Sequence, residues 1–130
     1  MPHTFPRGAR LRRRGEFTGV FEHGVKRHGQ LMSVCVRQSG TGRARVGIAA
    51  SKKVGGAVER NFTKRRVREL FRHLELAPGL DIVVMPREAM LRASLTAARQ
   101  EFEHLVDWAV RHGRRSSPPH ARRPGPALGV

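Results

Sequence analysis

The sequence predicts an α/β sandwich of the α+β type, in which helices pack on a mixed β-sheet. Apolar runs rich in Val, Leu and Ile predict buried strands, which we place at residues 30–36, 45–50 and 81–85. Segments with apolar residues at helical spacing predict helices, which we place at 16–22, 57–76 and 94–111. The order is therefore α-β-β-α-β-α, and a strand, helix and strand in succession usually give a parallel pair. For a chain of 130 residues we expect one domain, with a mixed sheet covered by helices on one face.

The chain begins with a basic segment and a short helix. Residues 1–14 hold five Arg and no acidic residue, so we expect a flexible arm. The first helix, at 16–22, has a one-sided apolar patch at positions i, i+3 and i+4, formed by Phe17, Val20 and Phe21. Gly24 is a typical residue to end it.

The two strands that follow are separated by the turn-forming residues 39–42, which predicts an antiparallel pair. The single cysteine, Cys35, lies in the first of these strands and has no partner for an intramolecular disulfide. A buried thiol is therefore expected, and it fits a reducing cytoplasm. Gly55 and Gly56 end the second strand and lead into the long helix, which Pro78 closes.

The last helix, at 94–111, carries apolar residues among polar ones: Leu95, Ala98, Phe102, Leu105, Val106 and Trp108. The tail that follows has four Arg, four Pro and no acidic residue, a composition that cannot build a core. We therefore expect a single domain at 15–112 and a basic, Pro-rich, disordered tail at 113–130.

The helix at 57–76 has two different stripes. The buried stripe is predicted to consist of Thr63, Val67, Leu70, Phe71 and Leu74. The other stripe is polar and mostly cationic, and consists of Asn61, Lys64, Arg65, Arg68 and Arg72. The whole chain has 26 Lys and Arg against 10 Asp and Glu, a net charge of +16. A solvated basic face is the simpler interpretation, but clustering along one helix face favours nucleic-acid binding.

Other classes of protein fit the sequence less well. No stretch is apolar and long enough to span a membrane, and the N-terminus lacks a secretion signal, so we expect a cytoplasmic protein. The His and acidic residues are scattered, so we expect no metal site and no catalytic side chain. Glu16, Glu59 and Glu69 are expected to pair with nearby Arg side chains.

The chain also resembles the protein subunit of bacterial ribonuclease P, over roughly residues 11–108. The resemblance is strongest in Arg45-Val46-Gly47, in Ser51-Lys52-Lys53-Val54-Gly55, in Ala57-Val58-Glu59-Arg60-Asn61, and in Lys64-Arg65 and Arg68-Glu69. The early residues Leu11, Phe17, Val20, Phe21 and Gly24 match as well. This resemblance implies a fourth strand and a left-handed βαβ crossover, which periodicity alone does not give.

The resemblance further implies a function and its residues. The catalytic RNA would be contacted by Lys52, Lys53, Arg60, Asn61, Lys64, Arg65, Arg68 and Arg72. The single-stranded 5′ leader of precursor tRNA would lie in a cleft between the first helix and the sheet, lined by Phe17, Phe21 and Val34. Hydrolysis of the phosphodiester would be carried out by the RNA with Mg²⁺ bound mainly by that RNA. No Mg²⁺ would be held by the protein alone, which we expect to be a monomer.

Two positions depart from the family pattern. Phe62 stands where the family has a cation, and we expect it to pack on the aliphatic part of Arg66 or on another local side chain rather than stack on RNA. Val34 is the nearest match to a strand position that is often aromatic in the family, and a valine cannot stack on a base. The leader would then depend on Phe17 and Phe21, unless these are core residues.

A structural RNA-binding protein of the ribosome is the alternative function, and an autonomous nuclease is disfavoured because metal ligands are missing.

Overall fold

The computed structural model describes residues 10–11, 13–38, 42–72 and 78–114. Within them the helices are α1 (Arg14–His23), α2 (Ala57–Arg72), the 3-10 helix η2 (Glu88–Arg92) and α3 (Leu95–Arg114). The strands are β1 (Val25–His28), β2 (Met32–Gln38), β3 (Arg45–Ile48) and β4 (Leu80–Pro86). The α+β class is confirmed, and β1 is the fourth strand that the family resemblance implied.

The four-stranded sheet has the order β1-β2-β4-β3. β4 pairs with β2 antiparallel and with β3 parallel, so the expected mixed sheet and the parallel pair around α2 are confirmed. The expected hairpin between 30–36 and 45–50 is wrong, because β4 lies between the two strands. β4 is almost fully buried, as suits a central strand, whereas the edge strand β1 alternates between half-buried and exposed. The handedness of the β3-α2-β4 crossover stays a prediction.

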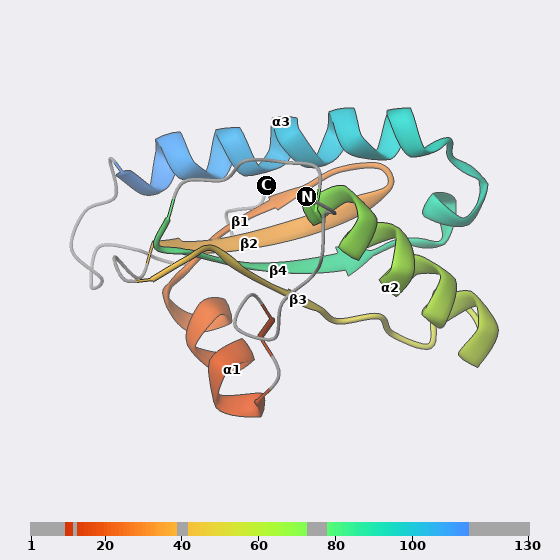
Figure 1. Cartoon of the computed structure of the whole chain (residues 1–130), viewed down its shortest axis with the longest axis horizontal. Coiled ribbons are helices and arrows are strands. Elements are labelled where there is room, and N and C mark those ends of the chain that lie inside the picture. The colour runs from red at the N-terminus through yellow and green to blue at the C-terminus, as the bar shows by residue number, and fades with distance from the viewer. Residues whose placement is uncertain (1–9, 12, 39–41, 73–77, 115–130) are drawn as a thin grey trace.

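The sheet has two different faces (Figure 1). We call them the α3 face, where α2 and α3 form the main core with the sheet, and the α1 face, on which α1 packs. Side chains alternate between the faces along each strand, so Val34 and Val84 join the main core while Cys35 and Val83 join Val20 of α1. The expectation that helices cover only one face is therefore wrong.

The domain begins before residue 15. The backbone N–H of Leu11 donates to the carbonyl of Val46 at 2.9 Å, and the Leu11 side chain is buried. Residues 10–11 thus run along β3 and belong to the folded domain, which shortens the expected arm. At the other end α3 continues to Arg114, two residues beyond the expected boundary at 112. The rest of the arm (1–9), the end of the predicted long helix with Leu74, and the tail from 115 lie outside the described residues.

Candidate RNA interface on α2 and the α1 face

The start of α2 is fixed by a carboxylate. Glu59 Oε1 accepts a hydrogen bond from the backbone N–H of Gly56 at 2.9 Å, which satisfies one of the free donors at the helix start. Gly55 has a φ of 145°, a conformation that favours glycine. Glu59 therefore caps the helix, and the expected pairing of Glu59 with an Arg is not among its contacts in the described part of the chain.

The buried stripe of α2 is confirmed as far as the helix is described. Thr63, Val67 and Leu70 are buried, and Phe71 is half-buried. The Thr63 hydroxyl donates to the carbonyl of Arg60 at 2.8 Å, so the only polar member of the stripe has its hydrogen bond. This side of α2 packs into the main core and fixes the direction of the other side.

The cationic stripe of α2 is accessible to a partner. Lys52, Lys53, Asn61 and Arg65 are exposed, while Arg60, Lys64, Arg68 and Arg72 are half-buried. Arg66 is not part of this stripe: it donates to the carbonyl of Ala93 at 2.7 Å, and its guanidinium lies 5.0 Å from the centre of the Phe62 ring. The expected packing of Phe62 on Arg66 is thus confirmed. Arg72 pairs with Glu69 at 3.1 Å, as expected for Glu69.

The surroundings of Arg68 in the stripe disfavour its charged form. Its Nε is shielded from solvent and has no hydrogen-bond partner among the described residues. Burial lowers the pKa of Arg68, and the positive charge of Arg10 lowers it further. Arg10 lies beside β3, where it bridges to Val46. Two guanidinium groups from distant parts of the sequence therefore repel each other here, and an anion between them would relieve that repulsion.

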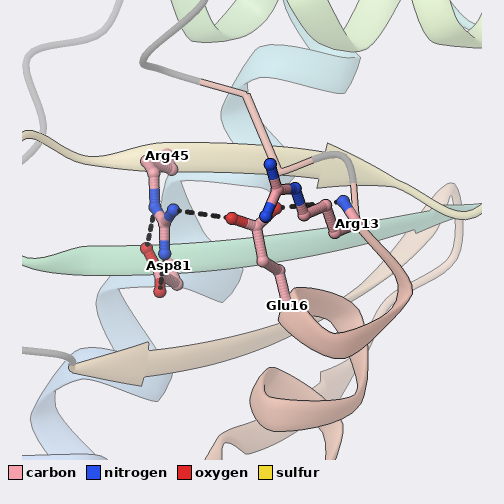
Figure 2. Close-up of polar contacts among 4 residues, drawn as sticks. All are labelled: Arg13, Glu16, Arg45 and Asp81. Carbon is pink, nitrogen blue, oxygen red and sulfur yellow. Dashed lines mark hydrogen bonds and ion pairs between the residues drawn. The ribbon is translucent and has the colours of Figure 1, made fainter.

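An ion-pair network holds α1 on the sheet (Figure 2). The Arg45 guanidinium donates from Nε and Nη2 to the two carboxylate oxygens of Asp81, at 3.0 and 2.8 Å, and from Nη1 to Glu16 Oε2 at 3.1 Å. The other oxygen of Glu16 accepts the backbone N–H of Arg13, just before α1, at 3.0 Å. The hydrogen bond to Asp81 is the main cause that raises the pKa of Arg45. The expected pairing of Glu16 with an Arg is confirmed.

The two predicted aromatic residues lie differently on α1. Phe17 is half-buried against Gly47 of β3, where an added Cβ would come within 2.7 Å of its ring. Phe21 is 38% exposed, and the Lys26 ammonium lies 5.6 Å from its ring centre. Phe17 thus contributes to the core under α1, as the alternative interpretation held, and Phe21 is available to a ligand.

Val34 is the one predicted leader residue that the structure places elsewhere. It is fully buried in the main core on the α3 face, so it cannot line a cleft beside α1. Cys35, the next residue, faces α1, and its thiol donates to the carbonyl of Val20 at 3.3 Å. Matching by spacing was off by one residue, which exchanges the two faces of a strand.

One row of side chains crosses the α1 face next to the core under α1, and its members Met85 and Ala49 pack against that core. The strand register places His28 opposite Ser33 and Ser33 opposite Met85, and Ala49 follows β3 beside Met85. His28 is exposed, Met85 and Ala49 are half-buried, and Ser33 is buried. We call these four residues the open row. Sequence patterns do not predict the open row, because β1 carries no clear apolar alternation.

Comparison with known proteins identifies the family. The model of the ribonuclease P family matches residues 5–110. The ribonuclease P protein component of Thermotoga maritima is 36% identical over 113 residues, covering 85% of this chain and 90% of that protein. The component from Ralstonia pickettii is 35% identical and covers 98% of this chain and 96% of that protein. This chain belongs to the ribonuclease P protein family.

Solved structures agree with this assignment. The ribonuclease P protein from Thermotoga maritima superposes with a TM-score of 0.65 at 30% identity, covering 84% of this chain and 98% of that one. A Staphylococcus aureus ribonuclease P protein mutant superposes with a TM-score of 0.71 at 27% identity, covering 80% and 90%. As a family member the chain is an RNA-binding component of a tRNA-processing ribonucleoprotein. The ribosomal alternative receives no support from these matches.

Four carboxylates of this ribonuclease P family member are engaged in structure. Glu16 and Asp81 bind Arg45, Glu59 caps α2, and Glu101 Oε2 accepts the backbone N–H groups of residues 31 and 32 at 2.8 and 3.1 Å. Over the described ranges, no three His, Cys, Asp or Glu side chains come together as they would to hold a metal ion. In the same ranges, no helix has the length and apolar character needed to cross a membrane.

Proposed function

We propose that this chain binds the catalytic RNA of ribonuclease P through the cationic stripe of α2 and assists removal of the 5′ leader from precursor tRNA. One observation carries the proposal. The exposed and half-buried cations of α2 share one surface, and among the described residues Glu69 is the only acidic residue that pairs with a member of the stripe. Phosphate groups of RNA supply the missing negative charge, and counterion release drives such binding.

The chemical step is assigned to the RNA. Hydrolysis of one phosphodiester releases the leader and leaves a 5′-phosphate on the mature tRNA. Mg²⁺ held mainly by the RNA would polarise the phosphate and activate water. The carboxylates described above do not converge into a site of the kind that Mg²⁺ needs, and their partners are Arg side chains and backbone N–H groups. The work of the protein is therefore electrostatic and positional.

The leader is assigned to the α1 face. Phe21 offers an exposed ring on α1, and Lys26 next to it offers a charge for a phosphate. Stacking on an aromatic ring tolerates any base, which suits a leader whose sequence differs between precursors. We expect the protein to act in the cytoplasm, as a monomer on its own, with the catalytic RNA and precursor tRNA as its partners.

The test is a reconstitution at low Mg²⁺. Precursor tRNA is incubated with the protein alone, with ribonuclease P RNA alone, and with both, and release of the leader is measured. We expect cleavage only when both are present, and cleavage by the RNA alone to return as Mg²⁺ is raised. Cleavage by the protein alone, or no benefit from adding the protein, would contradict the proposal.

A further inference from the structure

The open row contains one polar pair that the proposed function has not used. His28 Nδ1 lies 2.8 Å from the Ser33 hydroxyl oxygen, so the two side chains share a hydrogen bond across β1 and β2. Both side chains point to the α1 face, because the register pairs His28 directly with Ser33. His28 is exposed at the edge strand, whereas Ser33 is only 6% exposed.

The burial of Ser33 determines which His28 nitrogen carries a proton. Ser33 makes no other side-chain hydrogen bond among the described residues, so donation of its hydroxyl proton to His28 Nδ1 is the arrangement that leaves this buried donor satisfied. In neutral His28 this places the imidazole proton on Nε2, the nitrogen that does not contact Ser33. In the imidazolium form Nε2 carries a proton as well. His28 therefore presents an N–H donor in either state.

The surroundings of His28 are positive. Lys26 lies on the same face of β1, two residues away, and pairs with the Phe21 ring rather than with a carboxylate. Arg87, which follows β4, donates to the carbonyl of Gly29, next to His28 in the chain. The nearby Glu101 is engaged by the backbone N–H groups of Leu31 and Met32. The site favours an anionic acceptor over a neutral one.

We propose that His28, held by Ser33, is a leader-binding residue that donates a hydrogen bond from Nε2 to a phosphodiester oxygen of the RNA leader. This inference rests on the proposed function, since it assumes that the leader crosses the α1 face. At a strand spacing of about 4.8 Å, the open row spans roughly 14 Å from His28 to Ala49. An extended leader can then stack on Phe21 and rest on Met85 and Ala49, while His28 holds its backbone at the β1 edge.

Two amide variants provide the sharpest test. The amide nitrogen of Gln occupies about the position of Nε2 in histidine, whereas that of Asn occupies about the position of Nδ1. His28→Gln therefore keeps a donor toward the leader, and His28→Asn keeps only the contact to Ser33. Reconstituted holoenzyme is used to measure the affinity for precursor tRNA with its leader and for mature tRNA.

We expect His28→Asn and His28→Ala to weaken precursor binding about fivefold to tenfold, as the loss of one solvent-accessible hydrogen bond does. Mature tRNA should bind unchanged, and His28→Gln should stay within about twofold of the parent. His23→Asn is the matched control, because His23 is an exposed histidine at the end of α1, away from the open row. Precursors with different leader bases should show the same loss, since the acceptor is a phosphate.

A double-mutant cycle tests the role of Ser33. Ser33→Ala should weaken precursor binding by about twofold to threefold in the parent. In the His28→Ala background it should have no effect on this affinity, because Ser33 acts only by holding the His28 ring. Three outcomes would each overturn the proposal: equal effects of the Asn and Gln variants, an equal loss of affinity for both tRNAs, or a loss of affinity for one leader base only. If the parent itself shows no preference for precursor over mature tRNA, the leader assignment in the proposed function fails; if His28→Asn keeps the full preference of the parent, only the role of His28 fails.

Discussion

Arg45 and Arg68 are the same residue type in opposite electrostatic settings. Arg45 donates three hydrogen bonds to two carboxylates, and its pKa is raised. Arg68 has no carboxylate partner among the described residues, its Nε is shielded from water, and its pKa is lowered by burial and by Arg10. The first arginine stabilises the folded chain, and the second is suited to an anion from outside. For these two arginines, the carboxylates opposite Arg45 and the second cation beside Arg68 account for the difference.

The largest expected effect comes from breaking the Arg45 network. Asp81→Asn removes a buried charge that satisfies two donors of Arg45, so the free energy of unfolding should fall by about 3 kcal/mol in urea titrations. The control is Asp107→Asn, because Asp107 forms an exposed pair with Arg111 at 3.2 Å and its loss should cost at most about 0.5 kcal/mol. Equal costs for the two variants would mean that Arg45 is not held as the structure indicates.

The second prediction concerns the α2 stripe. Replacing Arg65 and Arg68 by Ala should weaken binding to ribonuclease P RNA by about 2 kcal/mol at low salt. It should also reduce the slope of log affinity against log salt by about 1.5, since two phosphate contacts are lost. The free protein should not lose stability, because Arg68 is repelled by Arg10.

Arg66→Ala is the matched control on the same helix. Because Arg66 donates to Ala93 and packs on Phe62, this variant should lose thermal stability and keep its salt slope. A reduced slope for Arg66→Ala, or an unchanged slope for the double variant, would place the RNA interface elsewhere.

The third prediction separates the two aromatic residues of α1. Phe21→Ala should weaken binding of leader-bearing precursor by about 1 kcal/mol, the lower end for loss of a stacking partner, with mature tRNA unaffected. Phe17→Ala should instead lower the free energy of unfolding, because Phe17 packs on Gly47 under α1. Thermal denaturation and the two tRNA affinities, measured for both variants, decide between these roles. A stability loss of the same size in both variants would make Phe21 a core residue as well.

The last prediction concerns Cys35, a buried thiol on which burial outweighs the opposing charge of Lys26. Burial raises the pKa of its thiol from 9.0 to about 11. The folded state keeps the proton to higher pH than the unfolded chain, so this contribution to stability is complete below pH 9 and is lost as the pH rises toward 11. Compared with Cys35→Ala, the parent should lose about 1 kcal/mol of unfolding free energy between pH 8 and pH 10. A constant difference over that range would mean that the thiol is accessible to water.

Much of the fold could be predicted because apolar spacing is a local signal. The α2 helix begins at Ala57 as expected, and its buried stripe is correct through Phe71. The strand at 81–85 is extended by one residue at each end in β4. The packing of Phe62 on Arg66 follows from helical spacing, which brings residues four apart together.

The errors concern pairing between distant segments, which local spacing does not determine. The short turn at 39–42 favoured a hairpin, but burial of β4 on both faces gives it the central position between β2 and β3. Val34 was assigned to the wrong face because counting from Val46 across two strands leaves the register open by one residue. The ion pairs of Arg45 with Glu16 and Asp81 join three separate segments, and no sequence motif predicts them.

The central place of β4 has a consequence for the newly made chain. β4 is the last strand in the sequence, yet it separates β2 from β3 in the sheet. While the ribosome is still translating the region before residue 80, the strands already made can pair only as the β1-β2 hairpin, and β3 has no neighbouring strand of the native sheet. The sheet can close only when β4, at residues 80–86, has emerged, and until then apolar strand edges stay open to aggregation or to chaperones. Folding of this domain should therefore be completed only after β4 has been made.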